Sequence, residues 1–395
     1  MEKRQGWSAR ALAIASLVTG LACAAWPLAG TATDADDTAR LVAGFPASGS
    51  RTVGTDEGPS RAYAQEVSTF WTEYEKRIGN AVREWACEEL GQADGATVFY
   101  PFSGPDLPWA VRLFPHADRY VLVALEKAEP PPRLESFSRQ ELEGYMGAFR
   151  KAWRFYGVEG YFRTNDLIVE TQARGMRLGI TGPLMAFAVR LGFEIESVEP
   201  IQLEMNSSDL VVRDERSTQE DLWDSVRLTL RRNARKVIVD YVRMDLSNAS
   251  LGRLPGVRRW VEREAMNPSI LKAAAHHLQE PAFSILRDSL VAYAPSIVQD
   301  ETGIAYGALA EQFNVRLYGR FTRPNSAFSQ EFQKSLAVAY QKNPGVKPLP
   351  FRLGYEKDAG TALQVAIRDG SGFQAPRSCG HSPSRPPQRT MRARR

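Results

Sequence analysis

Apolar and polar residues between Ala96 and Lys127 follow the order of a strand, a turn, a short helix and a second strand. The first strand is residues 97–100, where apolar and β-branched side chains end at Pro101. The second is residues 119–125, a continuous apolar run with the length of a strand buried on both faces. The turn and the acid after these strands therefore fall at the carboxyl ends of two neighbouring parallel strands. Open α/β sheets bind their ligands at that edge.

Longer stretches show the periodicity of amphipathic helices or of half-buried strands. Apolar residues at threes and fours predict helices over residues 59–91 and 138–155. Residues 226–230 and 236–244 alternate and predict a β-hairpin with one face in solvent. Further predicted elements include helices over 178–191, 255–266, 267–277 and 281–291, short strands over 193–203, 295–299 and 313–321, and a closing hairpin of 349–355 with 361–367.

Together these elements predict an α/β fold, a mixed, largely parallel Rossmann-like sheet flanked by helices. Residues 60–204 form a Rossmann-like half in this prediction, and residues 222–368 form a second α+β half packed on it. With 395 residues the chain is long enough for such a body to bury a sizeable core.

The amino end predicts export. Basic residues precede an uncharged, Ala-rich run over residues 11–25, and small residues follow, which is the plan of a secretory signal peptide. We expect residues 1–32 to be this signal and residues 33–58 to be a flexible linker. The expected location is periplasmic or extracellular, with membrane contact only through the signal segment or through a lipid anchor at Cys23.

Charge is distributed unevenly along the chain. The formal net charge of +4 includes +2 from residues 1–32 and +6 from residues 376–395, which leaves −4 for residues 33–375. A mildly acidic body does not favour binding to a phosphate backbone, so we expect no nucleic-acid partner. Residues 370–395 are rich in Arg, Pro and Ser, a composition that predicts a disordered basic tail.

Polar groups at the predicted strand ends are the candidate ligand-binding residues. They are Ser103, Gly104, Asp106, Glu126, Asp300 and Glu301. Carboxylates that converge could serve general acid and base chemistry. The alternative is that Asp106 caps the helix after it and that Asp300 and Glu301 belong to a turn.

The sequence contains no recognised motif for binding a metal ion or a cofactor. The four histidines show no recognised metal-ligand spacing, so we expect no metal ion and no cofactor. His276 and His277 fall on the predicted helix 267–277, where neighbouring side chains point about 100° apart and at most one of them would face a given site.

Two resemblances bear on fold and location. The unit over residues 97–126 resembles in outline the opening of S-adenosylmethionine-dependent methyltransferases, with an acid after the second strand where that design binds a ribose. It departs from that family at residues 102–108 (FSGPDLP), which contain one Gly in place of a Gly-rich G-x-G. Residues 99–126, 271–306 and 315–321 are similar to an uncharacterised family of exported bacterial proteins, which implies an extracytoplasmic location and transfers no activity.

Three classes of function follow from the sequence. The first is an exported protein that binds a small molecule or an envelope protein at a cleft between the two halves. The second is a hydrolase or transferase that uses the strand-end carboxylates. The third is a structural protein of the envelope.

Overall fold

The computed structural model describes residues 32–45, 57–90, 95–159, 179–214, 221–271, 275–324, 332–353 and 361–371. These residues belong to one unit that begins at Thr31. The predicted signal peptide lies outside the described residues apart from its last position, and the predicted basic tail lies outside them after residue 371. Among the described helices none combines the length and the apolar character that crossing a bilayer requires.

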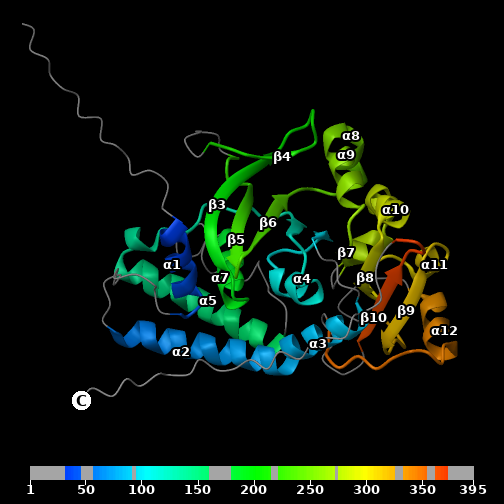
Figure 1. Ribbon diagram of the computed structural model, residues 1–395, viewed down its shortest axis with the longest axis horizontal. Coiled ribbons are helices and arrows are strands. Elements are labelled where there is room, and N and C mark those ends of the chain that lie inside the picture. The colour runs from blue at the N-terminus through cyan, green and yellow to red at the C-terminus, as the bar shows by residue number, and fades with distance from the viewer. Residues whose placement is uncertain are drawn as a thin grey trace, which may run out of the picture. The chain divides into compact units, whose positions relative to one another are not determined.

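A ten-stranded mixed sheet organises this unit, with the spatial order β4-β3-β5-β6-β2-β1-β7-β8-β10-β9 (Figure 1). The central strands from β6 to β8 are parallel, and antiparallel strands extend the sheet on both sides. The strands are β1 (Thr97–Pro101), β2 (Arg119–Ala124), β3 (Glu194–Leu203), β4 (Leu210–Val212), β5 (Ser225–Arg232), β6 (Arg235–Arg243), β7 (Ser269–Leu271), β8 (Ser296–Asp300), β9 (Asn314–Gly319) and β10 (Ala362–Ile367). The structure thus confirms an α/β fold with a mixed sheet. The sheet is not largely parallel as predicted, since four strand pairs are parallel and five are antiparallel.

Strands β1 and β2 are parallel neighbours, as predicted, with Thr97 opposite Arg119 and Pro101 opposite Val123. Their side chains alternate between two separate apolar cores, because successive residues of a strand point to opposite faces. Tyr100 packs in the core on one face and Phe99 in the core on the other. The sheet also joins strands from both predicted halves, since β2 pairs with β6 and β1 pairs with β7.

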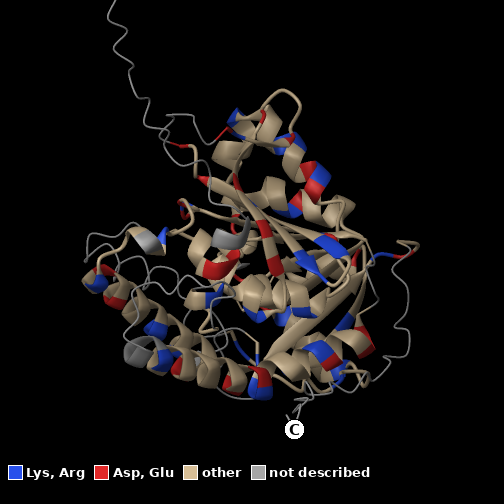
Figure 2. Ribbon diagram, turned by 60° about the vertical axis from the view of Figure 1, so that its left-hand side comes forward, with Lys and Arg blue, Asp and Glu red and all other residues tan. Residues whose placement is uncertain are grey.

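Helices cover both faces of the sheet. The core on the first face includes α1 (Ala32–Val42), α2 (Glu57–Tyr74), α3 (Asn80–Glu89), α4 (Leu107–Leu113), α5 (Arg139–Glu159) and α7 (Thr181–Arg190). The core on the second face includes α8 (Asn248–Arg253), α9 (Pro255–Glu264), α10 (Ser284–Tyr293) and α11 (Tyr306–Ala310). The helix α12 (Lys334–Lys342) packs with β9 and β10 in a third, smaller core, and a 3-10 turn spans Leu134–Ser136. Acidic and basic residues lie close to one another along these helices (Figure 2).

The long amphipathic helix predicted over residues 59–91 is interrupted by a π-helical turn, Glu75–Gly79, between α2 and α3. The three segments follow one another end to end in Figure 1. Within the turn Glu75 pairs with the guanidinium of Arg112, which is 4% exposed and lies over the rings of Trp71 and Tyr74. A π-turn inserts an extra residue without ending the helix, so the apolar stripe continues on both sides of this buried ion pair.

Three elements differ from the sequence-based prediction. The range predicted as a flexible linker contains α1, in which Val42 is buried and its carbonyl accepts hydrogen bonds from Tyr63 Oη at 2.6 Å and Trp153 Nε1 at 3.3 Å. The predicted helix over 267–277 is wrong, because its first part is β7. The predicted closing hairpin is also wrong, since β10 pairs with β8 and β9.

A buried ionic network joins the sheet to α9 on the second face. Asp240 on β6 is 0% exposed and accepts hydrogen bonds from Arg119 Nε at 2.7 Å and Arg227 Nε at 2.6 Å. Arg119 also donates to Glu264 at the end of α9, at 3.1 Å and 3.2 Å. Strands β5, β2 and β6 and helix α9 each contribute a charged group. The hairpin face predicted to lie in solvent is therefore partly covered.

Glu264 makes the stability of this network depend on pH. Burial raises the pKa of Glu264 above its ordinary value of 4.5, and the charge of Arg119 opposes that shift. Because the pKa of Glu264 is higher in the folded protein than in the unfolded chain, the folded protein binds this proton more tightly. The contribution of the bound proton to folding stability is complete below about pH 4.5 and is lost as pH rises through the folded pKa. Urea unfolding of wild type and Glu264→Gln across that range should show the stability advantage of wild type shrinking with pH. A constant difference would contradict this account.

Candidate functional site

The centre of the sheet contains a topological switch point between β1 and β7. After β1 the chain turns to α4 on the first face, and after β7 it turns through the 3-10 segments Ala275–Gln279 (η3) and Pro281–Phe283 (η4) to α10 on the second face. Numbered in chain order, the parallel strands β6-β2-β1-β7-β8 have the order 3-2-1-4-5. This is the order of doubly wound nucleotide-binding sheets, in which ligands bind outside the carboxyl ends of the strands at the switch point.

The loop after β1 has an unusual backbone at this point. Phe102 has a φ of 59°, in the left-handed region that a bulky side chain rarely adopts, and Gly104 has a φ of 54°. Ser103 anchors the loop on the neighbouring strand, because its N–H donates to the carbonyl of Val123 at 2.9 Å. Strained non-glycine conformations concentrate at ligand sites, where the surrounding fold holds them in place.

Aromatic rings from the loops after β1 and β7 meet beside the switch point. The ring centroid of Phe102 lies 5.6 Å from that of His277 and 5.7 Å from that of Phe283, and the His277 and Phe283 centroids are 5.0 Å apart. His276 stands next to His277, with ring centroids 4.3 Å apart, and His277 Nδ1 is 3.3 Å from Glu280 Oε1. We call Phe102, His276, His277, Glu280 and Phe283 the switch-point cluster. All five are half-buried except Glu280, which is exposed.

The segment that carries this cluster is anchored from three sides. Leu278 is fully buried, and its carbonyl accepts a hydrogen bond from Arg287 at 3.3 Å. Gln279 donates to two carbonyls of the loop after β8. Asn248, at the start of α8, donates to the carbonyl of Pro281 at 2.8 Å and accepts from the N–H of Ile285 at 3.0 Å. These bonds hold the 3-10 segments between the neighbouring loops.

Asp106 points into the first core. It is 6% exposed and accepts a hydrogen bond from Tyr100 Oη at 3.0 Å. It stands at the N-cap position of α4 without making a capping hydrogen bond. Burial, and to a lesser extent the charge of Asp106, raises the pKa of Tyr74 of α2 to about 12.

The other candidate acids contact different groups. Asp300 is 3% exposed, and its Oδ1 accepts from the N–H of Thr302 at 2.8 Å and from its hydroxyl at 2.5 Å, so it closes its own turn. Burial raises the pKa of Tyr340, and the negative charge of the buried Glu301 adds to this effect. Glu126 is half-buried after β2, and its carbonyl accepts from Tyr241 Oη at 2.8 Å. Ser103 and Gly104 thus lie at the switch point, while Asp106, Asp300 and Glu301 have buried contacts of their own.

Glutamine side chains hold the loop after β8. Gln299 is fully buried, and its amide donates to the carbonyl of Ile304 at 2.7 Å and accepts from the N–H of Ile304 at 2.9 Å. The Nε2 atoms of three other glutamines donate to loop carbonyls: Gln279 to Glu301 at 3.1 Å and to Gly303 at 3.0 Å, Gln333 to Glu301 at 2.7 Å, and Gln364 to Asp300 at 3.3 Å. Four separate segments therefore fix this loop, which in turn holds η3.

The residues that sequence reasoning missed are those of η3 and η4. Their signal is the string His276-His277-Leu278-Gln279-Glu280, of which the predicted helix 267–277 includes only the two histidines. On the 3-10 turn the ligand atoms of His276, His277 and Glu280 all lie within 4.8 Å of one another. A cavity under α4 is a weaker candidate for a ligand site. It is lined mainly by apolar side chains, among them Trp109 and Phe351, and its free volume of about 10 Å³ is near the lower limit for one water molecule.

Comparison with known proteins identifies no relative of this chain. No protein-family model matches the chain, and neither a curated protein nor a solved structure matches it significantly. Membership in the family of exported bacterial proteins therefore stays a prediction, as does the predicted location.

Proposed function

We propose that this chain is an exported protein that binds a small ligand with a planar ring at the switch-point cluster. The observation that carries the proposal is the strained backbone of Phe102 at the reversal point of a 3-2-1-4-5 sheet. The ring of Phe102 there meets His277 and Phe283, which are half-buried and could stack on or pack against a planar ligand.

A nucleoside is the ligand class that the strand arrangement favours. Glu126 follows Gly104 by 22 residues, close to the spacing of about 20 at which doubly wound sheets place the acid that binds a ribose. Beyond the parallel strands the sheet continues with β10 and β9, and β10 runs antiparallel to both of its neighbours, β8 and β9. The loop after β1 still departs from the methyltransferase family, because Pro105 has no N–H to donate to a ligand.

The contacts of the strand-end acids favour a binding protein over a hydrolase or transferase that uses these acids in catalysis. A general acid or base must reach the reacting group of its substrate. The hydrogen bonds of Asp106 and Asp300 are made with Tyr100 and Thr302, within the fold. The proposal therefore assigns recognition to the loop backbone and the aromatic rings, and gives these two acids a structural role.

The extracytoplasmic location rests on the amino end and on one cysteine. Cys87 is disulfide-bonded, and the two other cysteines of the chain lie outside the described residues. Disulfides persist in oxidising compartments and are rare in the cytosol. This observation supports export without identifying the compartment.

The substitution Phe102→Gly tests the proposed site without unfolding it. Glycine adopts a positive φ without strain, a gain of about 1–2 kcal/mol that offsets part of the loss of a half-buried ring. We expect a thermal-shift screen of the full chain against nucleosides, nucleotides, other aromatic metabolites and sugars to find a ring-bearing ligand that raises the Tm of wild type by several degrees. Phe102→Gly should lose most of that rise.

A second glycine substitution controls for the change in backbone. Asn233, in the turn between β5 and β6, has a φ of 58°, so Asn233→Gly makes the same change away from the cluster. Its ligand-induced rise in Tm should match that of wild type. Equal rises in Tm for wild type and Phe102→Gly would place the ligand elsewhere. A screen in which no compound raises the Tm would favour the third class of function, a structural protein of the envelope.

A further inference from the structure

Two imidazoles and a carboxylate converge on one short turn beside the switch point. The side-chain ligand atoms of His276, His277 and Glu280 lie within 4.8 Å of one another. The distance between His277 Nδ1 and Glu280 Oε1 is 3.3 Å. Donors that share a tetrahedral ion at about 2.0–2.1 Å stand roughly 3.3 Å apart, so this pair already has the required spacing.

We infer that His276, His277 and Glu280 form a binding site for a divalent transition-metal ion, Zn²⁺ foremost. Two His and one Glu are a ligand set that zinc uses in sites that keep an open position. Imidazole nitrogen also suits copper, nickel and iron, while all-oxygen sites suit calcium and magnesium. The donor set therefore selects against calcium and magnesium. The inference goes beyond the proposed ligand site and does not depend on it.

Stability alone does not explain why three such groups meet here. The His277 and Glu280 side chains are 40% and 48% exposed, and an ion pair with this exposure contributes about 0–1 kcal/mol. The ring centroids of the two imidazoles lie 4.3 Å apart, which places two side chains of the type that most often binds metal ions on one turn.

The surrounding contacts give the three donors a fixed frame. The ring of His277 packs against Phe102 and Phe283, and the peptide N–H of Glu280 donates to the carbonyl of His277 at 2.9 Å. Gln279, between the donors, is bound to the loop after β8. Ligands held by packing and hydrogen bonds lose little freedom when a metal ion binds.

Three protein donors leave a position on a tetrahedral ion for water or for a ligand atom. The rings of Phe102 and His277 are in contact, so an ion on His277 would lie next to the proposed ligand site. A ligand bound there could then complete the coordination. This consequence rests on the proposed function, whereas the metal site itself does not.

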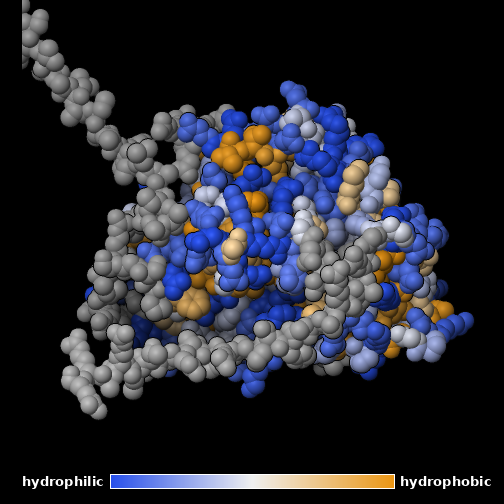
Figure 3. Space-filling view, viewed as in Figure 1, coloured by the Kyte–Doolittle hydropathy of each residue, from blue (hydrophilic) through white to orange (hydrophobic). Residues whose placement is uncertain are grey.

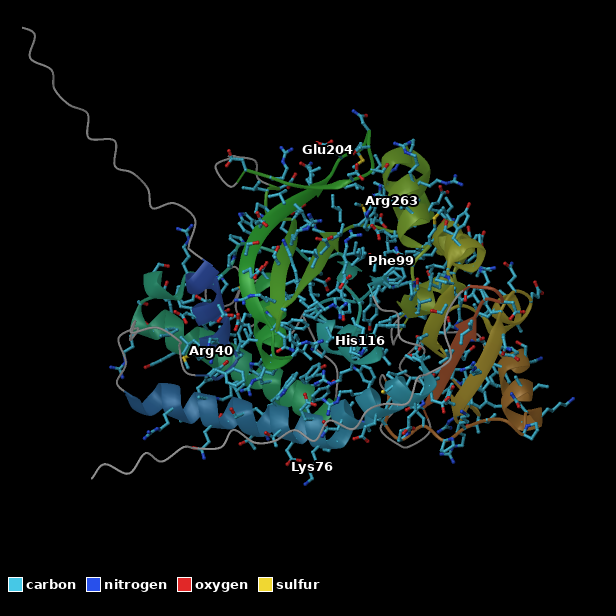
Figure 4. All side chains as sticks on the ribbon, in the orientation of Figure 1. Arg40, Lys76, Phe99, His116, Glu204 and Arg263 are labelled. Atoms are coloured by element: carbon cyan, nitrogen blue, oxygen red, sulfur yellow. The ribbon has the colours of Figure 1, made fainter. Side chains whose placement is uncertain are left out.

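The test is metal titration of the full chain after treatment with a chelator. We expect wild type to bind one Zn²⁺ with a higher Tm, and Co²⁺ in the same site to give the visible absorption of a low-coordinate ion. His276→Gln, His277→Gln and Glu280→Gln should each weaken Zn²⁺ affinity by more than about 100-fold, because losses of second-shell partners already cost 10–100-fold. His116→Gln is the matched control, since His116 is an exposed histidine on the turn before β2 (Figure 4), and it should bind Zn²⁺ as wild type does.

Two outcomes would overturn the inference: wild type without stoichiometric Zn²⁺ binding, or Zn²⁺ affinity that is the same in wild type and in the three cluster variants. Circular dichroism of each variant establishes that it is folded. Glu280→Gln separates the two proposals, because Glu280 contributes no ring to the ligand site: this variant should lose Zn²⁺ binding while the metal-free protein keeps the ligand-induced rise in Tm. Loss of Zn²⁺ binding in Glu280→Gln with an intact ligand-induced rise in Tm leaves the ligand proposal standing, and stoichiometric Zn²⁺ binding by wild type without any ring-bearing ligand leaves the metal site standing.

Discussion

Replacing Asp240 with Asn is expected to destabilise the folded protein by about 3 kcal/mol, one of the two largest effects predicted for this chain. Asp240 is 0% exposed and lies between two guanidinium groups. An Asn side chain keeps the shape but removes the charge and turns an NH₂ donor toward an arginine. The effect falls at the lower end of the range for breaking a buried ion pair, because Arg119 and Arg227 remain 26% and 23% exposed to water.

Guanidinium-induced unfolding followed by circular dichroism measures this loss as a lower midpoint at an unchanged slope. The matched control is Glu194→Gln, which breaks the 2.6 Å contact between Glu194 and Arg231 on the neighbouring strands β3 and β5. Both of those side chains are more than half exposed, so the expected cost is under about 1 kcal/mol. Equal losses in the two variants would show that burial of Asp240 does not determine the strength of its contacts.

The same residues show what sequence reasoning could and could not reach. Alternation in β5 and β6 predicts the hairpin correctly, because the period of two appears directly in the sequence. It also suggests that charged positions such as Arg227 and Asp240 face water. Only the tertiary arrangement brings Arg119 and Glu264 from β2 and α9 onto that face, and opposite charges from distant segments make burial possible.

One part of the candidate site could likewise be predicted from the sequence, and the other part could not. Strands β1 and β2 were predictable because each buries both faces and is a continuous apolar run, and this placed Ser103 and Gly104 at the correct edge of the sheet. Strand β7 has three residues, too few to show a period, and the Ala-rich residues after it favour a helix. Missing β7 removed the switch point from the prediction. It also separated His276 from His277, since an α-helix would point their rings apart, whereas the structure holds them 4.3 Å apart.

A group of exposed apolar residues lies near β3 and β4, in a region whose contacts with α9 are part of the fold (Figure 3). Figure 3 shows a mostly hydrophilic face, with a group of apolar residues near β3 and β4 at its upper side. Met205 and Val212, in this region, are 45% and 46% exposed. Part of this segment is already bound within the fold, because Arg263 of α9 contacts Asp209 at 2.8 Å and Arg259 contacts the carbonyl of Met205 at 2.9 Å. Figure 4 labels Glu204 and Arg263 on the two segments that meet there.

Replacing Gly303 with Ala is the other change with a large expected effect, a loss of about 2–4 kcal/mol of stability. A Cβ at this position would lie 2.5 Å from Gln299 Oε1 and 2.9 Å from Gln299 Cβ. Gln299 is fully buried, so its side chain has little room to move aside. Moving it would break both of its hydrogen bonds to Ile304 and leave buried backbone groups without partners.

Gly252→Ala is the matched control, because a Cβ there meets no atom within 4 Å and the residue lies in α8. Alanine in a helix is favourable relative to glycine by up to about 1 kcal/mol, so this variant should be as stable as wild type or slightly more stable. Chemical unfolding of both variants gives the comparison. Similar stabilities would show that Gln299 yields to the added methyl group and that the loop after β8 is less constrained than its hydrogen bonds indicate.

The consequence of Gly303→Ala for metal binding follows from Gln279. Its amide donates to the carbonyls of Glu301 and Gly303, so a displaced loop releases one anchor of the turn that carries His276, His277 and Glu280. Losing such outer-shell support weakens metal sites by about 10–100-fold, and Zn²⁺ affinity of the folded variant should fall within that range. A variant that loses stability but binds Zn²⁺ as tightly as wild type would show that packing against Phe102 and Phe283 is enough to position the donors.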